Sequence, residues 1–536
     1  MEEIKNSPKT IALPLVLCIG LAGGFLLGMN LRGGGITKNQ SGGGYQKLKE
    51  VFGLIDNEYV DDAKTDELVE ETIQELLTKL DPHSLYHPIS EKLAVEQDIN
   101  GSYEGIGIEF NIFRDTLAVA TVLSGGPSEA VGLQTGDKIV SVDGKNIASI
   151  KLKSSDVFKL LKGPKGSEVN VHVMRRKSGI DFKIIRDKIP QNSVDASYMI
   201  EPETAYIKLR IFSRQTSTEF RDALTALKEQ GMKRLIVDLQ DNGGGSLADV
   251  AEVADEFLAE GKMIVETKGK DTRFNDSYKA TAHGNFEQGD LIVLIDEGSA
   301  SASEILSGTL QDNDRALIVG RRSFGKGLVQ TMFDLSDGSQ LRLTISRYYT
   351  PSGRSIQKPY DIYPNEIATR FKHGELFNAD SVKFNDSLKY KTSNGRTVYG
   401  GGGIMPDYFV ALDTAENSSY LLALYTSNSI QEYTVQYATN NKTLLEKMSW
   451  EDFYKNFTVT DQMLRDLMKT GETNSVKSNW KEMERIKNVF QIHVKANIAR
   501  KFWKTNGYYQ IMNQNNEILQ KALTLFDKIP VLNSKQ

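Results

Sequence analysis

The sequence predicts a mixed α/β body preceded by a β-rich module, with helical segments at both ends and one helix that crosses a membrane. Three observations lead to this prediction. Apolar strands alternate with helical stretches between Ala205 and Gly320, which is typical of a sheet with helices on its faces. Short strands and glycine-centred turns fill residues 101–190. The uncharged run from Ile11 to Leu31 is long enough for a transmembrane helix, which needs about 20 residues.

The composition excludes several classes of protein. A chain of 536 residues exceeds the size of one hydrophobic core, so several domains are expected. With 65 basic and 70 acidic residues the net charge is -5, which argues against nucleic-acid binding because no basic excess is present. The content of 25% charged and 39% hydrophobic residues is that of a folded protein. Cys18 is the only cysteine and the six histidines are scattered, so we expect no intrachain disulfide, metal or other cofactor.

We interpret residues 11–31 as an uncleaved signal anchor that follows a short cytoplasmic tail, residues 1–10. A cleavable signal peptide is the competing interpretation, but its apolar region usually has about 7 to 15 residues, and no convincing A-x-A cleavage site follows here. Positive charge on the two flanks favours a cytoplasmic N-terminus slightly. The protein is therefore expected to be a single-pass protein of the cell membrane, with its body on the extracytoplasmic (periplasmic) side.

Composition and periodicity divide the rest of the chain. The expected segments are a flexible linker (32–44), a helical N-terminal segment (45–100), the β-rich module (101–190), the α/β body (191–413) and a helical C-terminal region (414–536). Glycine and polar residues indicate the linker, and apolar residues at helical spacing in LVEETIQELLTKL indicate the first helical segment. Within the body, Asp337-Gly338 and Asn394-Gly395 predict hairpin turns.

A serine cluster precedes a helical run in the body. Ser299, Ser301 and Ser303 stand directly before EILSGTL. Backbone amides at a helix N-terminus can stabilise an anion, and a nucleophilic serine placed there gains part of an oxyanion hole from its neighbour's amide. Serines before a helix are also ordinary N-caps. This feature alone therefore leaves both interpretations open.

A lysine lies in a glycine loop further along, in the segment GRRSFGKG. The neighbours of Lys326 are apolar and small, and burial among such residues lowers a lysine pKa enough for it to act as a base. A lysine in a turn between two strands would have similar neighbours. The segment also resembles a phosphate-binding loop, but Gly327 stands where a hydroxyl is required and a strand follows instead of a helix. Nucleotide hydrolysis is therefore not favoured.

A run of three glycines, residues 243–245, ends the strand RLIVDL and precedes a helix. Glycines allow the backbone to approach a ligand and direct its amides toward it. A flexible strand-to-helix turn is an equally good interpretation of this run on its own.

In combination, these motifs resemble the carboxyl-terminal processing peptidases, also called tail-specific proteases. The resemblance extends from about Tyr45 to Asp413. It is carried by LDPHSLY, GIGIEF, DNGGG, GSASASEI, RRSFGKGLVQ and YYTPSGRSIQ. It implies a crotonase/ClpP-like body in which Ser301 is the nucleophile, Lys326 is the general base and Gln330 orients the lysine. The resemblance also makes a structural or capping role more plausible for the other two serines of the cluster.

The resemblance implies a hydrolysis without histidine. Neutral Lys326 takes the proton of Ser301, the alkoxide attacks a peptide carbonyl, and the lysine returns the proton to the leaving amine. The amides of Ala302 and Gly244 are expected to hold the oxyanion. The glycine loop departs from the family's usual Arg-Asn-Asn-Pro-Gly-Gly run, since its first, second and fourth residues are glutamine, aspartate and glycine here. Without the proline this loop is more flexible, which affects the assignment of Gly244 as the second oxyanion donor.

The β-rich module resembles a PDZ domain, a fold that captures peptide C-termini. The peptide is expected to offer its carboxylate to the GIGIEF amides and to pair along the following strand, opposite a helix around Ser154 to Leu161. The expected peptide-binding residues are Gly105, Ile106, Gly107, Ile108 and Phe110. A PDZ domain that only packs against the body is the alternative.

These inferences predict a membrane-anchored serine endopeptidase. It would cut proteins near flexible, apolar C-termini, with the PDZ domain recognising the tail and gating the Ser-Lys dyad. Its partners would be protein or peptide substrates, the membrane through residues 11–31 and a second copy of the chain, because family members often dimerise through their end segments. A catalytically silent PDZ scaffold that binds protein C-termini is the alternative function.

Overall fold

The computed structural model describes residues 42–533, apart from residues 100, 114–115, 124, 135, 151–153, 176–177, 283 and 383–384. The predicted cytoplasmic tail, the transmembrane segment and most of the linker lie outside the described residues. Within the described ranges, no helix is both long and apolar enough to cross a membrane. The chain divides into two units, Met1–Leu76 and Leu77–Gln536.

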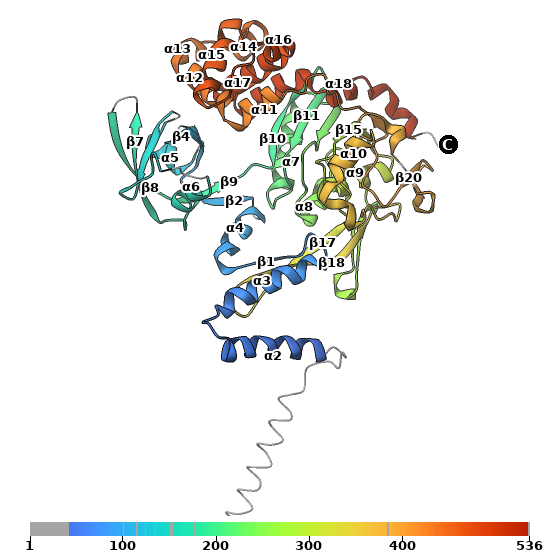
Figure 1. Ribbon diagram of the computed structural model, residues 1–536. Helices are drawn as coiled ribbons and strands as arrows, with labels where there is room; N and C mark the ends of the chain where they lie inside the picture. The colour runs from blue at the N-terminus through green and yellow to red at the C-terminus, as the bar shows by residue number, and fades with distance from the viewer. Residues whose placement is uncertain are drawn as a thin grey trace, which may run out of the picture. The chain divides into compact units, whose positions relative to one another are not determined.

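Two helices, α2 (Gly42–Glu58) and most of α3 (Thr65–Thr78), make up the described part of the first unit (Figure 1). Helix α3 begins with Asp66 and Glu67, which suits the positive end of the helix dipole. Helix α2 leaves Tyr45 and Leu54 largely exposed, at 76% and 62%. An apolar face of this helix is therefore not covered within the unit.

The β-rich module forms one antiparallel sheet in the order β3-β4-β5-β7-β8, with β6 (Lys145–Asn146) beside β5. Its elements are β3 (Ile108–Phe113), β4 (Thr116–Val122), α5 (Pro127–Ala130), β5 (Lys138–Val142), α6 (Ser154–Leu161), β7 (Glu168–Arg175) and β8 (Ser178–Ile185). Alternation along β7 buries Val169, Val171 and Val173 and turns the intervening residues outward. A separate pair, β2 (Ser102–Gly105) and β9 (Asp187–Pro190), connects the module to the body.

The body is built on a six-stranded mixed sheet in the order β10-β11-β12-β15-β16-β21. The strands are β10 (Val194–Glu201), β11 (Thr204–Leu209), β12 (Arg234–Asp238), β15 (Asp290–Ile295), β16 (Leu317–Gly320) and β21 (Tyr408–Phe409). Strands β10 and β11 are antiparallel, and all the following pairs are parallel. The predicted α/β body with a mixed sheet and flanking helices is confirmed.

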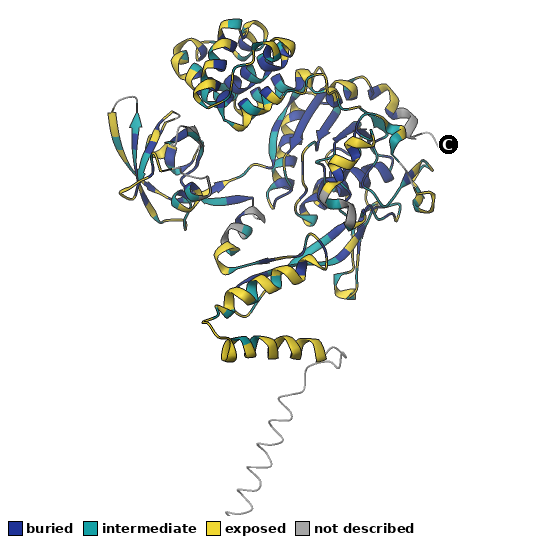
Figure 2. Ribbon diagram, in the orientation of Figure 1, coloured by how far each residue is buried: buried dark blue, intermediate teal, exposed yellow. Residues whose placement is uncertain are grey.

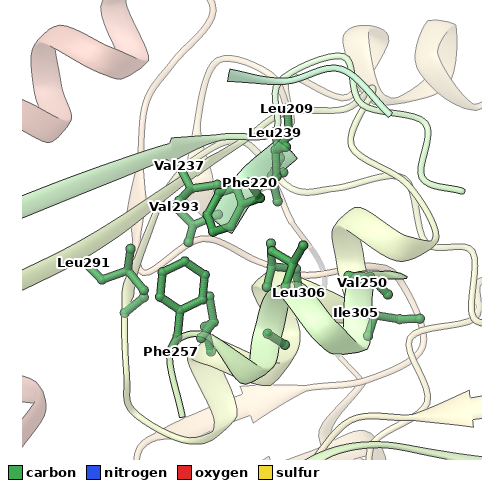
Figure 3. Packing of buried hydrophobic residues seen from close by; sticks show 14 of the residues in the cluster. Leu209, Phe220, Val237, Leu239, Val250, Phe257, Leu291, Val293, Ile305 and Leu306 are labelled. Carbon is green, nitrogen blue, oxygen red and sulfur yellow. The ribbon is translucent and has the colours of Figure 1, made fainter. Parts of the chain in front are cut away.

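Three helices cover one face of this sheet: α7 (Thr216–Glu229), α8 (Leu247–Asp255) and α9 (Ala302–Asp312). Figure 3 shows Val237 of β12 and Val293 of β15 packed with Phe220 of α7 and Leu306 of α9. All four side chains are fully buried. Packing of this kind fixes the start of α9 against the ends of the central strands.

A second sheet has the order β1-β18-β13-β14, with β17 also paired to β18. Its strands are β1 (Leu85–His87), β13 (Met263–Gly269), β14 (Asp276–Lys279), β17 (Leu328–Asp334) and β18 (Gln340–Tyr349). The hairpin predicted at Asp337-Gly338 joins β17 to β18, and Gly338 takes a φ of 93°. The hairpin predicted at Asn394-Gly395 joins β19 (Lys389–Lys391) to β20 (Thr397–Tyr399).

The C-terminal region is helical and belongs to two cores. Helices α11 (Ser419–Thr426), α12 (Ser429–Asn440), α13 (Lys442–Leu445), α14 (Trp450–Asn456), α15 (Asp461–Thr473), α16 (Trp480–Arg485) and α17 (Lys487–Met512) enclose a core of their own. Helix α18 (Glu517–Leu523) instead buries Leu519 and Ala522 against the second face of the body's sheet. Figure 2 shows the contrast between the buried strands of the body and the exposed outer faces of these helices.

Candidate active site

Ser301 lies where the chain passes from β15 into helix α9. It has a φ of 56° and a ψ of -113°, a left-handed conformation that costs a residue with a side chain roughly 1–3 kcal/mol and is often found at active sites. The preceding turn is held by the carboxylate of Asp296, which accepts hydrogen bonds from the amides of Gly298 and Ser299 at 3.0 and 3.1 Å. The structure therefore fixes Ser301 in an unusual conformation while leaving it only half-buried.

The two flanking serines are buried and make hydrogen bonds to the main chain. Ser299 donates its hydroxyl proton to the carbonyl of Leu239 at 2.8 Å, and Ser303 donates to the carbonyl of Asn242 at 2.8 Å. Both residues are fully buried. These contacts tie the serine turn to the end of β12 and to the glycine loop, which is a structural role.

Lys326 lies in the loop between β16 and β17. Burial lowers its pKa to about 8, and the nearby guanidinium of Arg342 contributes to this shift, while the carboxylates of Glu304 and Asp81 act in the opposite direction. A substantial fraction of the lysine is therefore neutral in mildly alkaline solution. This is the property that a lysine base requires.

Glu304 joins the serine turn to the lysine loop. Its Oε2 accepts hydrogen bonds from the amides of Ser301 and Lys326 at 2.8 and 2.9 Å. Its Oε1 accepts from the hydroxyl of Ser323 and the amide of Gly325. The carboxylate is fully buried, and this burial raises its pKa although the four hydrogen bonds oppose the shift. Glu304 was not predicted from the sequence, although the S-x-x-E spacing from Ser301 is a recognisable capping pattern.

Tyr348 makes a second link between the two loops. Its hydroxyl donates to the carbonyl of Lys326 at 2.7 Å and lies 3.2 Å from the carbonyl of Ser301. The side chain is fully buried on β18, and burial raises its pKa well above the ordinary value, so it remains a proton donor. The serine and lysine main chains are thus connected twice, once through amides and once through carbonyls.

Gly244 packs directly against the serine turn. Its φ is 100°, and a Cβ at this position would lie 2.7 Å from Cβ of Ser301 and 2.8 Å from the amide nitrogen of Ala302. Only glycine fits such an approach. The Gly244 amide donates to Oδ1 of Asn242 at 2.9 Å. The structure therefore brings the two expected oxyanion donors together, with the Gly244 proton engaged by Asn242 in this conformation.

Gln330 lies on β17, beyond a β-bulge between Val329 and Gln330. Its Nε2 donates to the hydroxyl of Thr344 on β18 at 3.3 Å. Gln330 therefore belongs to the second sheet, the lysine loop joins β16 of the first sheet to β17 of the second, and Ser301 follows β15 of the first sheet.

An aromatic wall lies beside the lysine loop. His83 contacts Tyr363 with its Nε2 3.1 Å from the phenolic oxygen, and the ring of Phe324 meets that of Tyr363 edge-on at 5.5 Å. Burial lowers the pKa of His83 to about 4, and the positive charge of Lys326 adds to this shift. His83 is thus neutral at physiological pH, and the LDPHS turn lies beside the lysine loop.

The expected peptide-binding residues gather at one edge of the β-rich module. Ile106 and Ile108 are buried, Gly107 has a φ of 73°, and Gly105 ends β2. In the described part of the sheet β3 is an edge strand, so its free side is available to an added strand. The ring of Phe110 meets that of Phe158 on helix α6 edge-on at 5.3 Å, so the two aromatic side chains are in direct contact between β3 and α6, where the peptide is expected.

Comparison with known proteins shows which family this arrangement belongs to. Residues 203–367 match the model of peptidase family S41, residues 105–185 match the PDZ domain, and residues 420–504 match a family of unknown function. The carboxy-terminal-processing protease of Bartonella bacilliformis is 34% identical over 331 residues, which are 60% of this chain and 75% of that protein.

A probable CtpA-like serine protease of Staphylococcus aureus (strain N315) is 34% identical over 317 residues, which are 58% of this chain. The match covers 62% of that relative's own length. The solved structure of a photosystem II D1 C-terminal processing protease is 27% identical, covers 69% of this chain and 87% of its own, and superposes with a TM-score of 0.37.

The fold and these matches define a chain with a PDZ domain ahead of an α/β body of the S41 peptidase type. The chain belongs to peptidase family S41, the family of the carboxy-terminal-processing proteases.

Proposed function

We propose that this chain is a serine endopeptidase that cuts proteins near apolar, flexible C-termini. The observation that carries the proposal is the shared carboxylate oxygen of Glu304, which holds the amides of Ser301 and Lys326 together. Ser301 is the nucleophile and Lys326, with its pKa lowered to about 8, is the general base. Gln330 orients the lysine.

The proposed reaction begins when the neutral lysine amine takes the hydroxyl proton of Ser301. The serine oxygen bonds to the peptide carbonyl carbon, and the lysine then gives its proton to the leaving amine. Water repeats the steps on the acyl-enzyme and releases the new C-terminus. The Ala302 amide at the start of α9 stabilises the oxyanion, and Gly244 joins it when its amide leaves Asn242.

The PDZ domain is proposed to select the substrate tail. The free edge of β3 and the buried Ile106 and Ile108 suit an extended peptide that ends in an apolar residue. We propose that tail binding gates the dyad. Residues 11–31 are proposed to anchor the protein in the cell membrane with the body on the extracytoplasmic side, and the body is proposed to be crotonase/ClpP-like.

A homo-oligomer is proposed as well, supported by the exposed apolar side chains of α2 such as Tyr45 and Leu54. Sedimentation velocity of the detergent-solubilised full-length chain tests it. A monomer at all concentrations would contradict the proposal.

The function is tested with peptides that end in an apolar residue. Ser301→Ala and Lys326→Ala should each abolish cleavage of a peptide that the wild type cuts, while both variants still bind the tail. Ser277→Ala and Lys268→Ala, at exposed positions on β14 and β13, are matched controls that should cleave normally. A wild type that binds such tails but cuts no peptide would instead support the silent scaffold.

A further inference from the structure

Strand β18 is paired on both sides near the candidate site. On one side it meets β17, where Thr344 lies directly opposite Gln330. On the other side it meets β1, where Arg342 lies opposite Leu85. The turn that precedes β1 contains Asp81 and Ser84, and it therefore lies against the opposite edge of β18 from Gln330.

A chain of hydrogen bonds crosses β18 between these two sides. Gln330 donates from Nε2 to the hydroxyl oxygen of Thr344 at 3.3 Å. Thr344 in turn donates its hydroxyl proton to Oδ1 of Asp81 at 3.2 Å. The amide of Thr344 also donates to the hydroxyl of Ser84 at 3.1 Å, which fixes the turn to the strand.

The direction of this chain is set by the carboxylate at its end. Asp81 also accepts hydrogen bonds from the hydroxyl of Ser84 at 2.7 Å and from the amides of His83 and Ser84 at 2.7 and 2.8 Å. Partial burial opposes the charge, but these hydrogen bonds outweigh it and hold the pKa of Asp81 below its ordinary value. An ionised carboxylate only accepts protons, so the single hydroxyl proton of Thr344 points toward Asp81.

The orientation of the Gln330 amide follows from this. Because the Thr344 proton is committed to Asp81, the hydroxyl oxygen can only accept from Gln330, so the glutamine must present its NH₂ group there. The other end of the amide, Oε1, is left to accept a hydrogen bond. A neutral lysine amine needs an acceptor for an N–H so that its lone pair faces the serine hydroxyl.

We propose that Thr344 and Asp81 are positioning residues that fix the Gln330 amide with Oε1 toward Lys326, and so direct the lysine lone pair at Ser301. The inference rests on the proposed function. We call the hydrogen bonds from Gln330 through Thr344 to Asp81 the relay. Without the relay the Gln330 amide can rotate by half a turn and present its NH₂ group to Lys326, where it competes with the serine proton for the lysine lone pair.

The test uses the full chain and a peptide that ends in an apolar residue. Thr344→Val has the same shape without the hydroxyl and should lower kcat about 10- to 100-fold at unchanged KM, by analogy with the loss found when the hydrogen-bond partner behind a metal ligand is removed. Thr344→Ser restores the hydroxyl and should stay within about threefold of the wild type. Thr331→Val, on the neighbouring strand and outside the relay, is the matched control and should keep the wild-type kcat.

Asp81→Asn adds a second readout. The charged groups that face Lys326 are Arg342 from β18, Glu304 from α9 and Asp81 from the turn, and Asp81 raises the lysine pKa. Asp81→Asn should lower kcat and move the midpoint of its rise with pH to lower pH, whereas Thr344→Val should lower kcat without moving the midpoint. The double variant, Asp81→Asn with Thr344→Val, should have a kcat less than about twofold below that of the slower single variant.

Two results would overturn the relay while leaving the proposed function intact. One is a folded Thr344→Val variant with the kcat of the wild type. The other is a double variant whose fold loss of kcat equals the product of the two single losses, because the effects of two residues that act independently multiply. If Ser301→Ala cleaves as well as the wild type, the proposed function fails and the relay fails with it.

Discussion

The amides of Ser301 and Lys326 point at the same atom, Oε2 of Glu304, at 2.8 and 2.9 Å. Ser301 lies in the turn between β15 and α9 and Lys326 in the loop between β16 and β17, so this atom is a point at which the two halves of the candidate site meet. Their relative position is thereby set by the main chain, while both side chains remain free to react.

Replacing Glu304 by glutamine should therefore separate the two halves. The carboxamide keeps the volume but turns an NH₂ group toward amide donors, which leaves buried groups without acceptors at about 1–3 kcal/mol each. We expect a lower urea midpoint and a loss of kcat of about 100-fold or more. Glu203→Gln, at an exposed turn position, is the control. Full activity of a folded Glu304→Gln variant would contradict this role.

Removal of the Tyr348 hydroxyl should have a smaller effect. In Tyr348→Phe the carbonyl of Lys326 loses the hydroxyl that donates to it at 2.7 Å. Because this position is buried from water, the free energy of unfolding should fall by about 1–2 kcal/mol. We expect a lower melting temperature and a moderate fall in kcat at unchanged KM for peptides. Calorimetry and steady-state kinetics measure the two effects. A rise in KM with no change in kcat would place Tyr348 in substrate binding instead.

The activity should rise with pH through about 8, because the base works only when neutral. Arg342→Leu removes a positive neighbour and should raise the pKa of Lys326, so the midpoint of kcat/KM against pH should move upward. A profile that is flat between about pH 7 and 9.5 would exclude a lysine base with this pKa.

The free energy of unfolding should also depend on the titration of Lys326, and it should rise with pH. The folded pKa of about 8 lies below the ordinary lysine pKa of 10.5, so the unfolded chain binds more protons between these values. The cost of burying the lysine is fully present below pH 8 and disappears as the pH approaches 10.5. Relative to Lys326→Met, the wild type should therefore gain stability as the pH rises through this window, measured by urea unfolding.

The glycine loop offers a matched pair of substitutions. Gly244→Ala would place a Cβ 2.6 Å from the carbonyl of Ala300 at a φ of 100°, so the serine turn must move. A Cβ added at Gly243 would meet no atom within 4 Å, and the φ of this residue is ordinary. We expect Gly244→Ala to lower both the melting temperature and kcat, and Gly243→Ala to keep the wild-type melting temperature. Equal melting temperatures for the two variants would contradict the close packing.

The α/β body, the PDZ domain and the serine and lysine loops could be predicted from the sequence. The patterns that indicate them, apolar strands, helical spacing and short motifs, each lie within a short run of residues. Glu304 and Tyr348 were not predicted, because their side chains bind main-chain amides and carbonyls. Every residue has these groups, so the sequence of the bound segments does not indicate the contact. The direction of the Gly244 amide depends on Asn242 and could not be read from glycine spacing. The division of the C-terminal region between two cores was missed, because α17 belongs mainly to the helical core and also bonds to β10 through Asn506 and Tyr509, whereas α18 packs into the core of the body. The transmembrane segment stays a prediction.

The contact between His83 and Tyr363 joins residues 280 positions apart in the chain. The aromatic wall therefore exists only after the turn at residues 81–84 has met the 3-10 helix Tyr360–Asn365, and the relay only after the same turn has met β18. A chain still being synthesised has no such wall and no oriented base. On the proposed function, the enzyme is harmless to itself and to neighbouring nascent proteins until it has folded, and this protection comes from the order of folding itself.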